Sequence, residues 1–343
     1  MQMDRKFDKL LHFVVITLMA VSCAAPPEFL TFRGFAQGTT YSVIYEDVAG
    51  IGNKAMRDTV EWVLREFDMS MSLYVDSSIV SRINRNEHAE PDKYFIDIFN
   101  ISREAWKLTD GAFDITVGPL VNAYGFGRDT LNTFSETVRD SLMNLVGMEK
   151  VDIVDGLLVK QDPGITLDFN AIAQGYSVDL VSDLLESMGI KNYLVEIGGE
   201  VRAGGTKYGQ YWRIGVDKPE EGNEVPGAEL QAIIRMKNAS LNTSGNYRNF
   251  YVDDGVKYSH TINPKTGDPA RNTLLSATIV APDCAWADAI ATSCMVMGKD
   301  KAIELINSRK ELEGFLVYSD ESGKYRTWTS KGLEKLVDEN PNF

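Results

Sequence analysis

The sequence predicts an α+β fold in which helices are interspersed with short strands. Helical and strand-like apolar patterns both occur along the chain, but they do not alternate in the regular βαβ rhythm of a doubly wound sheet. Several strand pairs are separated by tight turns, which is typical of antiparallel hairpins. With 343 residues, of which 44% are hydrophobic and 24% charged, the chain can bury a sizeable core.

Three helices are predicted from apolar residues that recur on one helical face. The Gly175–Met188 helix has Gly189 as its C-terminal stop, and Thr109-Asp110-Gly111 ends the helix before it. The apolar faces of the first two are Val60, Val63, Leu64 and Phe67, and then Phe95, Ile98, Phe99 and Trp106.

Strands are predicted from short β-rich runs bounded by turn residues. A hairpin is expected from Asn249 to Ile262 around the turn Asp253-Asp254-Gly255, which puts His260 near the end of a strand. The other predicted strands are Tyr41–Tyr45, Tyr193–Ile197, Arg213–Val216, Gln231–Met236 and Gly314–Tyr318.

The N-terminus has the pattern of a bacterial lipoprotein leader. Basic residues precede an apolar run from Leu10 to Val21 that is too short for a typical membrane-spanning helix. It ends in Ala20-Val21-Ser22-Cys23, which resembles a lipobox, although an ordinary secretory signal is the alternative. We therefore expect a signal peptide over 1–22, a lipidated Cys23 with a tether over 23–30, and one domain over 31–340. The mature chain would be exported and lipid-anchored on the periplasmic side of a membrane.

Two further cysteines, Cys284 and Cys294, lie in an Ala-rich stretch that reads as one helix. Ten residues of helix separate them by about 15 Å, which is too far for a disulfide. They are expected to be buried free thiols.

The charge balance limits the class of partner. The chain has 49 acidic and 35 basic residues, a net charge of −14. This argues against nucleic acid as a partner and against charge-driven binding to an anionic membrane. Any phosphorylated ligand would need a local device such as a metal ion, a helix N-terminus or backbone amides.

Asp288 and Thr292 have a spacing that could hold a metal. Residues i and i+4 share one helical face, so the carboxylate and the hydroxyl can converge on Mg²⁺ or Ca²⁺. Spacing alone favours a simpler interpretation, in which Asp288 caps the helix and Thr292 bonds its own backbone.

Three other segments could carry chemistry. The block from Gly111 to Gly127 is rich in small residues and either approaches a ligand or forms a tight turn. Asp168 precedes a helix N-terminus, where it could be a cap or part of an anion site. His260 precedes a Pro/Gly-shaped loop, and outside the leader the only other histidine is His88.

The order of these motifs resembles the ApbE family of FAD:protein FMN transferases over about residues 35–335. The block Gly-Ala-Phe-Asp-Ile-Thr-Val-Gly-Pro-Leu and the histidine followed by Pro and Thr-Gly carry most of that resemblance. It implies two interlocked lobes with mixed or antiparallel sheets and FAD in the cleft between them. It also implies a set of site residues: catalytic His260; FAD contacts at Tyr74, Ala112, Phe113, Asp114, Asp168, Gln174 and Ile262; and metal ligands at Asp288, Thr292 and the carbonyl of Ala171.

The reaction implied by the resemblance is transfer of FMN from FAD to a Thr or Ser hydroxyl of a partner flavoprotein, with release of AMP. The partner would carry a Ser/Thr-Gly-Ala-Thr-type motif and belong to a membrane respiratory complex. Two alternatives remain at this stage. One is an FAD pyrophosphatase that uses water as the acceptor, and the other is a flavin-binding lipoprotein without chemistry.

Overall fold

The computed structural model describes residues 28–48, 50–127, 135–220, 222–223, 225, 227–246, 250–253, 256–259 and 261–339. The predicted signal peptide, Cys23 and His260 therefore lie outside the described residues. Within them, every pair of neighbouring strands is antiparallel. Strands and helices are interspersed, as the α+β prediction requires.

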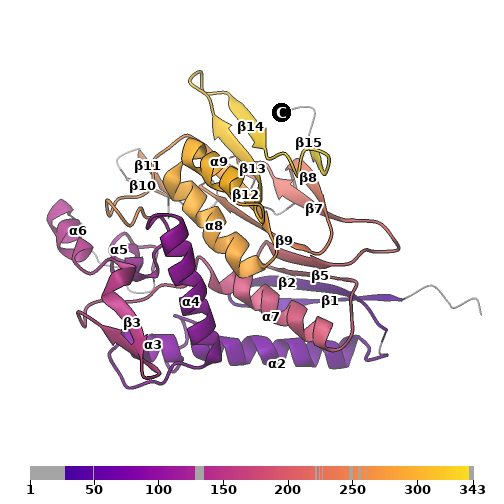
Figure 1. Cartoon of the computed structure of the whole chain (residues 1–343), viewed down its shortest axis with the longest axis horizontal. Coiled ribbons are helices and arrows are strands. Elements are labelled where there is room, and N and C mark those ends of the chain that lie inside the picture. Colours follow the sequence, from indigo (N-terminus) through magenta and orange to yellow (C-terminus); the bar gives the residue numbers. More distant parts are fainter. Residues whose placement is uncertain are drawn as a thin grey trace, which may run out of the picture.

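A large antiparallel sheet forms the centre of the molecule (Figure 1). Alternate residues of its strands face opposite layers: in the strand Tyr193–Ile197, Val195 and Ile197 pack against helices, and Leu194 packs against a second sheet. In spatial order the strands are β1 (Phe29–Ala36), β2 (Thr39–Glu46), β5 (Tyr193–Ile197), β6 (Glu200–Gly204), β9 (Ala239–Gly245), β12 (Leu274–Ala281), β13 (Glu313–Ser319) and β14 (Tyr325–Thr329).

A smaller sheet covers one face of the large one. Trp212 and Ile234 from the smaller sheet share a core with Val201 and Phe315 of the larger. Its strands, in spatial order, are β15 (Val337–Glu339), β8 (Leu230–Met236) and β7 (Trp212–Asp217). Two separate hairpins complete the strands: β3 (Val151–Val154) with β4 (Leu157–Lys160), and β10 (Phe250–Asp253) with β11 (Val256–Ser259).

Helices cover the opposite face of the large sheet. Val60 and Val181 pack onto β1, β2 and β5, and Ile290 and Ile306 pack onto β12 and β13. The covering helices are α2 (Asn53–Met71), α7 (Ala173–Ser187), α8 (Cys284–Met297) and α9 (Lys299–Ser308).

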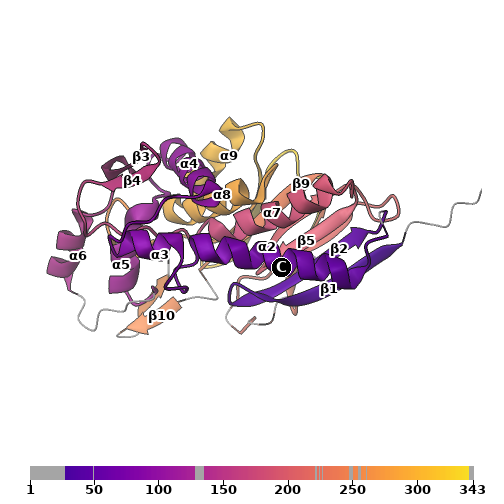
Figure 2. The same ribbon diagram turned by 90° about the horizontal axis from the view of Figure 1, so that it is seen from below.

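A second, mainly helical lobe lies at the end of the molecule away from the start of β1 (Figure 2). Its core includes Phe95, Phe99 and Phe169, and also Phe67 and Ala289 from α2 and α8. The two lobes share these helices and are therefore interlocked. The remaining elements are α3 (Ile79–Asn84), α4 (Lys93–Leu108), α5 (Gly118–Ala123), α6 (Glu136–Met143) and the 3-10 turns Ile115–Val117 and Met148–Lys150.

The structure agrees with the elements expected from sequence. All three predicted helices and all five single strands are present, each with slightly different ends. The hairpin is present as β10 and β11, but its second strand ends at Ser259 rather than Ile262. Cys284 and Cys294 are buried free thiols on α8, as predicted. In the described part of the chain, no helix has the length and apolar character needed to cross a membrane.

Candidate active site

The candidate site is centred where α7 and α8 cross. An acid of each helix binds the first turn of the other. The Asp179 carboxylate of α7 accepts hydrogen bonds from the amides of Cys284 and Ala285, both at 2.9 Å. The Asp288 carboxylate of α8 accepts one from the Gly175 amide at 3.2 Å. This exchange fixes the two helices relative to each other, because free amides at a helix N-terminus need acceptors.

The crossing is close because Gly175 has no side chain. A Cβ at this position would lie 2.5 Å from the Cys284 carbonyl oxygen and 2.9 Å from the Ala285 Cα. The backbones of α7 and α8 are therefore in direct contact at Gly175. This contact brings Asp288 to the beginning of α7.

Strand β9 presents polar side chains to α8. Asn242 donates a hydrogen bond to the Asp288 carboxylate, and the Ser244 hydroxyl lies 3.2 Å from the Thr292 hydroxyl. Two residues of a strand and four residues of a helix both advance by about 6 Å, so the two pairs match. Asp288 and Thr292 therefore face the same strand, as their spacing predicted.

The residues expected to bind a metal fit that role. Gly175 is four residues after Ala171, but its amide donates to Asp288 instead of the Ala171 carbonyl. No donor within the described part of the chain binds that carbonyl. Burial raises the pKa of Asp288 to about 7, despite the hydrogen bonds from Gly175 and Asn242. A free carbonyl and a buried, undercompensated carboxylate are oxygen ligands suited to Mg²⁺ or Ca²⁺.

The simpler interpretation of this pair is wrong in one respect and unsupported in the other. Asp288 lies inside α8, whose N-cap is Asp283, so Asp288 does not cap its own helix. The side chain that bonds its own helical backbone is that of Ser293, which donates to the Ala289 carbonyl.

The prediction that Asp168 caps α7 is also wrong. That position is Ile172, and the Asp168 carboxylate accepts from the Asn170 amide within the preceding loop.

The Gly111–Gly127 block packs against the loop that carries Asp168. The Asp168 amide donates to the Ile115 carbonyl at 2.7 Å, and a Cβ at Gly118 would lie 2.7 Å from the Thr166 carbonyl oxygen. Burial raises the pKa of Asp168, against one favourable backbone hydrogen bond. The middle of this segment is the 3-10 turn Ile115–Val117 followed by α5, packed beside a predicted site residue.

Asp114 holds this block in place from inside the protein. One of its carboxylate oxygens accepts from the amide and hydroxyl of Thr116, and the other accepts from the Met148 amide. Burial raises the pKa of Asp114, and these hydrogen bonds oppose that rise. The side chain is therefore used to join residues 114–116 to 147–148, while Ala112 and Phe113 beside it are buried.

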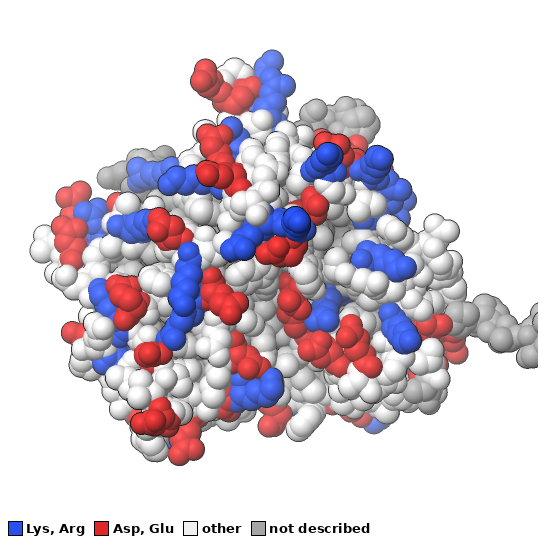
Figure 3. All heavy atoms as spheres, in the orientation of Figure 1, with Lys and Arg blue, Asp and Glu red and all other residues white. Residues whose placement is uncertain are grey.

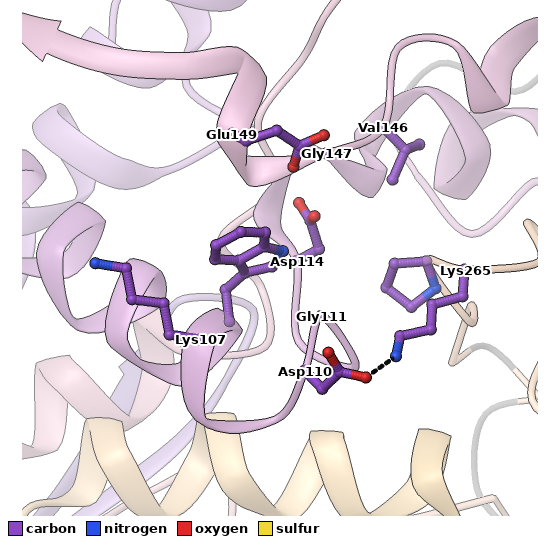
Figure 4. Close-up of a pocket in the computed structure, with 10 residues that line it drawn as sticks. Lys107, Asp110, Gly111, Asp114, Val146, Gly147, Glu149 and Lys265 are labelled. Atoms are coloured by element: carbon purple, nitrogen blue, oxygen red, sulfur yellow. Dashed lines mark hydrogen bonds and ion pairs between the residues drawn. The ribbon is translucent and has the colours of Figure 1, made fainter.

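A cavity of about 450 Å³ adjoins the block. Figure 4 shows Asp110, Gly111 and Asp114 on one side of it and Lys265 reaching to Asp110, with the two charged atoms 2.5 Å apart. Lys265 lies in the turn that follows Ile262. The cavity lining comes from α4, the Gly111 block, residues 146–149 and residues 264–265. These segments are distant in sequence and include two of those singled out above.

The other predicted FAD contacts are placed as follows. Gln174 is the second residue of α7, and its amide nitrogen lies 2.6 Å from where a Cβ of Gly198 would be. Ile262 is buried and pairs with Pro269. Tyr74 is 67% exposed in the loop between α2 and α3.

Some residues of this site had not been singled out from sequence. Asn242 and Ser244 were missed because β9 was not recognised as a strand. Its two polar residues at a spacing of two were the available signal. Glu200 was missed as well, although its carboxylate is close enough to Asp288 for the Asp288 charge to raise the pKa of Glu200.

The visible surface has no single charged region. Acidic and basic side chains are interspersed on the face drawn in Figure 3. No broad area of a single sign is visible on this face.

Comparison with known proteins identifies the fold as that of flavin transferases. The structure of the flavin transferase ApbE from Vibrio cholerae matches with a TM-score of 0.80 and 32% identity, covering 91% of this chain and all of the other. A protein named FAD:protein FMN transferase from the same species is 36% identical, covering 90% of this chain and 95% of its own. One of that name from Haemophilus influenzae is 33% identical, covering 96% and 99%.

The model of the ApbE family matches residues 37–316. The chain belongs to the ApbE family. This confirms the resemblance drawn from the ordered motifs, and the antiparallel α+β fold predicted with it.

Proposed function

We propose that the protein transfers FMN from FAD to a threonine or serine hydroxyl of a partner flavoprotein and releases AMP. Membership of the ApbE family supports this reaction, as do relatives that are named FAD:protein FMN transferase. The observation that carries it is the buried Asp288 carboxylate, which lies on the same face of α8 as Thr292 and binds the Gly175 amide at the start of α7. Such a carboxylate could hold the cation that a pyrophosphate needs, and FAD is cleaved at its pyrophosphate. A net charge of −14 would otherwise oppose binding of that group.

The proposed step is an in-line displacement at the FMN phosphorus. The acceptor oxygen forms the new phosphoester bond, the bond from that phosphorus to the bridging oxygen breaks, and AMP leaves with the bridging oxygen. A divalent cation held by Ala171, Asp288 and Thr292 would neutralise charge on the pyrophosphate. His260 would accept the proton of the acceptor hydroxyl, an effect worth about 10²–10⁴-fold in rate.

The position of His88 supports the choice of His260. His88 is exposed beside α3 and lines a different cavity, with Leu157 and Lys160 of β4. It is not among the residues that line the Asp114–Lys265 cavity. Apart from the leader, His260 is then the remaining histidine in the sequence.

We place one end of FAD in the cavity beside Gly111. At about 450 Å³ it has the size of a small-ligand site, and the predicted contacts Ala112 and Asp114 lie in the block beside it. Binding here would put a flavin or adenine ring between the Gly111 block and the turn that contains Lys265.

The test is mass spectrometry of an acceptor that carries the Ser/Thr-Gly-Ala-Thr-type motif, after incubation with FAD, Mg²⁺ and the protein. We expect one added FMN per acceptor with the wild type and with Asp283→Ala, a matched change at an exposed acid of the same helix. Asp288→Ala should abolish the addition. Equal FMN addition by Asp288→Ala would remove the metal assignment, and AMP release without labelled acceptor would favour the pyrophosphatase.

We also propose that Cys23 carries a lipid and that the mature chain is anchored on the periplasmic side of a bacterial membrane. The leader pattern and the lipobox-like Ala20-Val21-Ser22-Cys23 support this. Mass spectrometry of the N-terminal peptide should show a diacylglyceryl group on Cys23. Cys23→Ala should release the protein into the soluble fraction, and retention in the membrane would contradict the proposal.

A further inference from the structure

Glu200 has a buried carboxylate that the reaction outlined above does not use. It is the first residue of β6, directly after the Gly198-Gly199 turn from β5. Its Oε2 atom is inaccessible to solvent and has no hydrogen-bond partner among the described residues. The carboxylate accepts a hydrogen bond from the Glu200 amide itself, but a buried oxygen atom without a partner is still unfavourable.

The direction of this carboxylate is set by the glycine turn. A Cβ at Gly198 would lie 3.0 Å from Glu200 Oε2 and 2.6 Å from Gln174 Nε2, and Gly198 has a φ of +67°. The absence of a side chain at Gly198 therefore leaves space between the Glu200 carboxylate and the start of α7. Ala171 and Gly175 lie at this same helix start.

A second polar group beside Asp288 is also unsatisfied. Asn242 is 2% exposed, and its Oδ1 atom accepts no hydrogen bond from the described residues, while its other side-chain atom donates to Asp288. Glu200 Oε2, Asn242 Oδ1 and the carbonyl of Ala171, just before the start of α7, are thus three oxygen atoms that lack a donor among the described residues. Such a set is expected around a cation and is unfavourable without one.

No basic side chain described here compensates Glu200. The nearby buried guanidinium, that of Arg202, lies 2.9 Å from Asp179, 3.1 Å from Asp183 and 3.5 Å from Glu186. The charge acting most strongly on Glu200 is that of Asp288, which repels it. Two nearby carboxylates in the protein interior stay ionised together only when a cation offsets their repulsion; without one, the less acidic of the two takes up a proton.

We propose that Glu200 is the second carboxylate of the cation site, facing the same divalent ion as Asp288 and strengthening its binding. This inference rests on the metal-dependent site of the proposed function. It adds a residue outside the predicted ligand set of Ala171, Asp288 and Thr292. The expected effect on affinity is that of a polar partner just outside the ligands, about 10–100-fold.

The test measures binding of Mg²⁺ alone to the mature full chain by titration calorimetry, without FAD or acceptor. Glu200→Gln keeps the shape and removes the charge, and we expect it to raise the Mg²⁺ dissociation constant about 10–100-fold. The matched control is Asp183→Asn. It also removes one negative charge, but from an acid that pairs with Arg202 and whose side chain is 64% exposed. It should change the constant less than about 2-fold, because exposed charges are screened.

Thermal unfolding separates this role from a structural one. In EDTA, Glu200→Gln should unfold at the wild-type temperature or higher, because an uncompensated buried acid is removed. Its stabilisation by Mg²⁺ should be smaller, because that gain follows the binding constant. Unchanged Mg²⁺ affinity in Glu200→Gln, or no Mg²⁺ binding by the wild type, overturns the inference. Glu200-dependent Mg²⁺ binding without FMN transfer would instead refute the proposed function and leave the inference standing.

Discussion

Gly175→Ala tests whether the close crossing of α7 and α8 is required. Two effects of opposite sign compete. Replacing a helical glycine by alanine stabilises a helix by about 1 kcal/mol when the methyl group has space. Here the new Cβ would lie 2.5 Å from the Cys284 carbonyl oxygen, where 3.4 Å begins ordinary contact, and the atoms it meets are backbone. The helices must therefore separate by several tenths of an ångström or more.

Overpacking of this kind costs about 1–3 kcal/mol, so it should exceed the gain in helix propensity. We expect Gly175→Ala to lower the free energy of unfolding by about 1–2 kcal/mol. The assay is urea unfolding in EDTA. Gly164→Ala is the control, because its Cβ would meet only the side-chain ends of Asp162 and Leu145, which can move. The same variant should bind Mg²⁺ more weakly, because Asp288 moves away from the start of α7.

A result in the opposite direction would refute the reasoning. If Gly175→Ala is more stable than the wild type by about 1 kcal/mol, the helices separate without cost and the crossing does not fix Asp288. Unchanged Mg²⁺ affinity together with lower stability would show that the contact supports the fold but not the site.

Three further predictions concern charges and thiols outside the predicted ligand set. Arg202→Met should lower the free energy of unfolding by about 3 kcal/mol, because it leaves buried Asp179 uncompensated. Arg213→Met, at an exposed position of β7, should cost little, and equal effects would contradict this. If Cys23 is lipidated as proposed, the native chain should show no thiol reactive toward Ellman's reagent and two after unfolding, since burial raises the pKa of Cys284 and Cys294. Fast labelling of the native chain would contradict this. The Ser322 hydroxyl and Arg326 lower the pKa of Asp320. Its contribution to stability is therefore present above about pH 4 and lost as the pH falls below that value. Asp320→Asn should flatten the acid side of the melting-temperature profile, and an unchanged slope would contradict the assignment.

The parts of the fold that followed from sequence are those whose apolar residues face a single layer. On α2, Val60 and Leu64 pack on the sheet, and Phe67, one turn further along the same face, packs in the core of the helical lobe. The Asp253–Val256 hairpin follows from local turn chemistry. Such signals need no knowledge of distant residues.

Strand β9 shows why other parts could not be predicted. Its segment Asn242-Thr243-Ser244 is polar, although Asn242 is buried. Polar residues in a central strand are tolerated here because Asp288, Thr292 and Thr278 supply partners from α8 and β12. These partners are 35 to 48 residues away in sequence, so no local pattern indicates them.

The residues of the candidate site could be predicted from the sequence, but their arrangement in space could not. The spacing of Asp288 and Thr292 predicted a shared face correctly. It could not show that Asp288 reaches across to Gly175 at the start of α7, which is 113 residues earlier. For the same reason Glu200 was visible in the sequence only as part of a turn.

The chain from Cys23 to the end of β1 limits how far the candidate site of an anchored molecule can lie from the bilayer. Phe29 comes six residues after Cys23, a reach of about 20 Å when extended. β1 then runs from Phe29 to Ala36, about 23 Å. Gln37, the next residue, contacts Ser177 of α7 at the site end. If Cys23 is lipidated as proposed, that end lies no more than about 45 Å from the bilayer surface. Acceptor hydroxyls farther than this from the bilayer could not enter the site. Distance from the membrane would therefore limit which partner proteins are modified, independently of recognition by side chains.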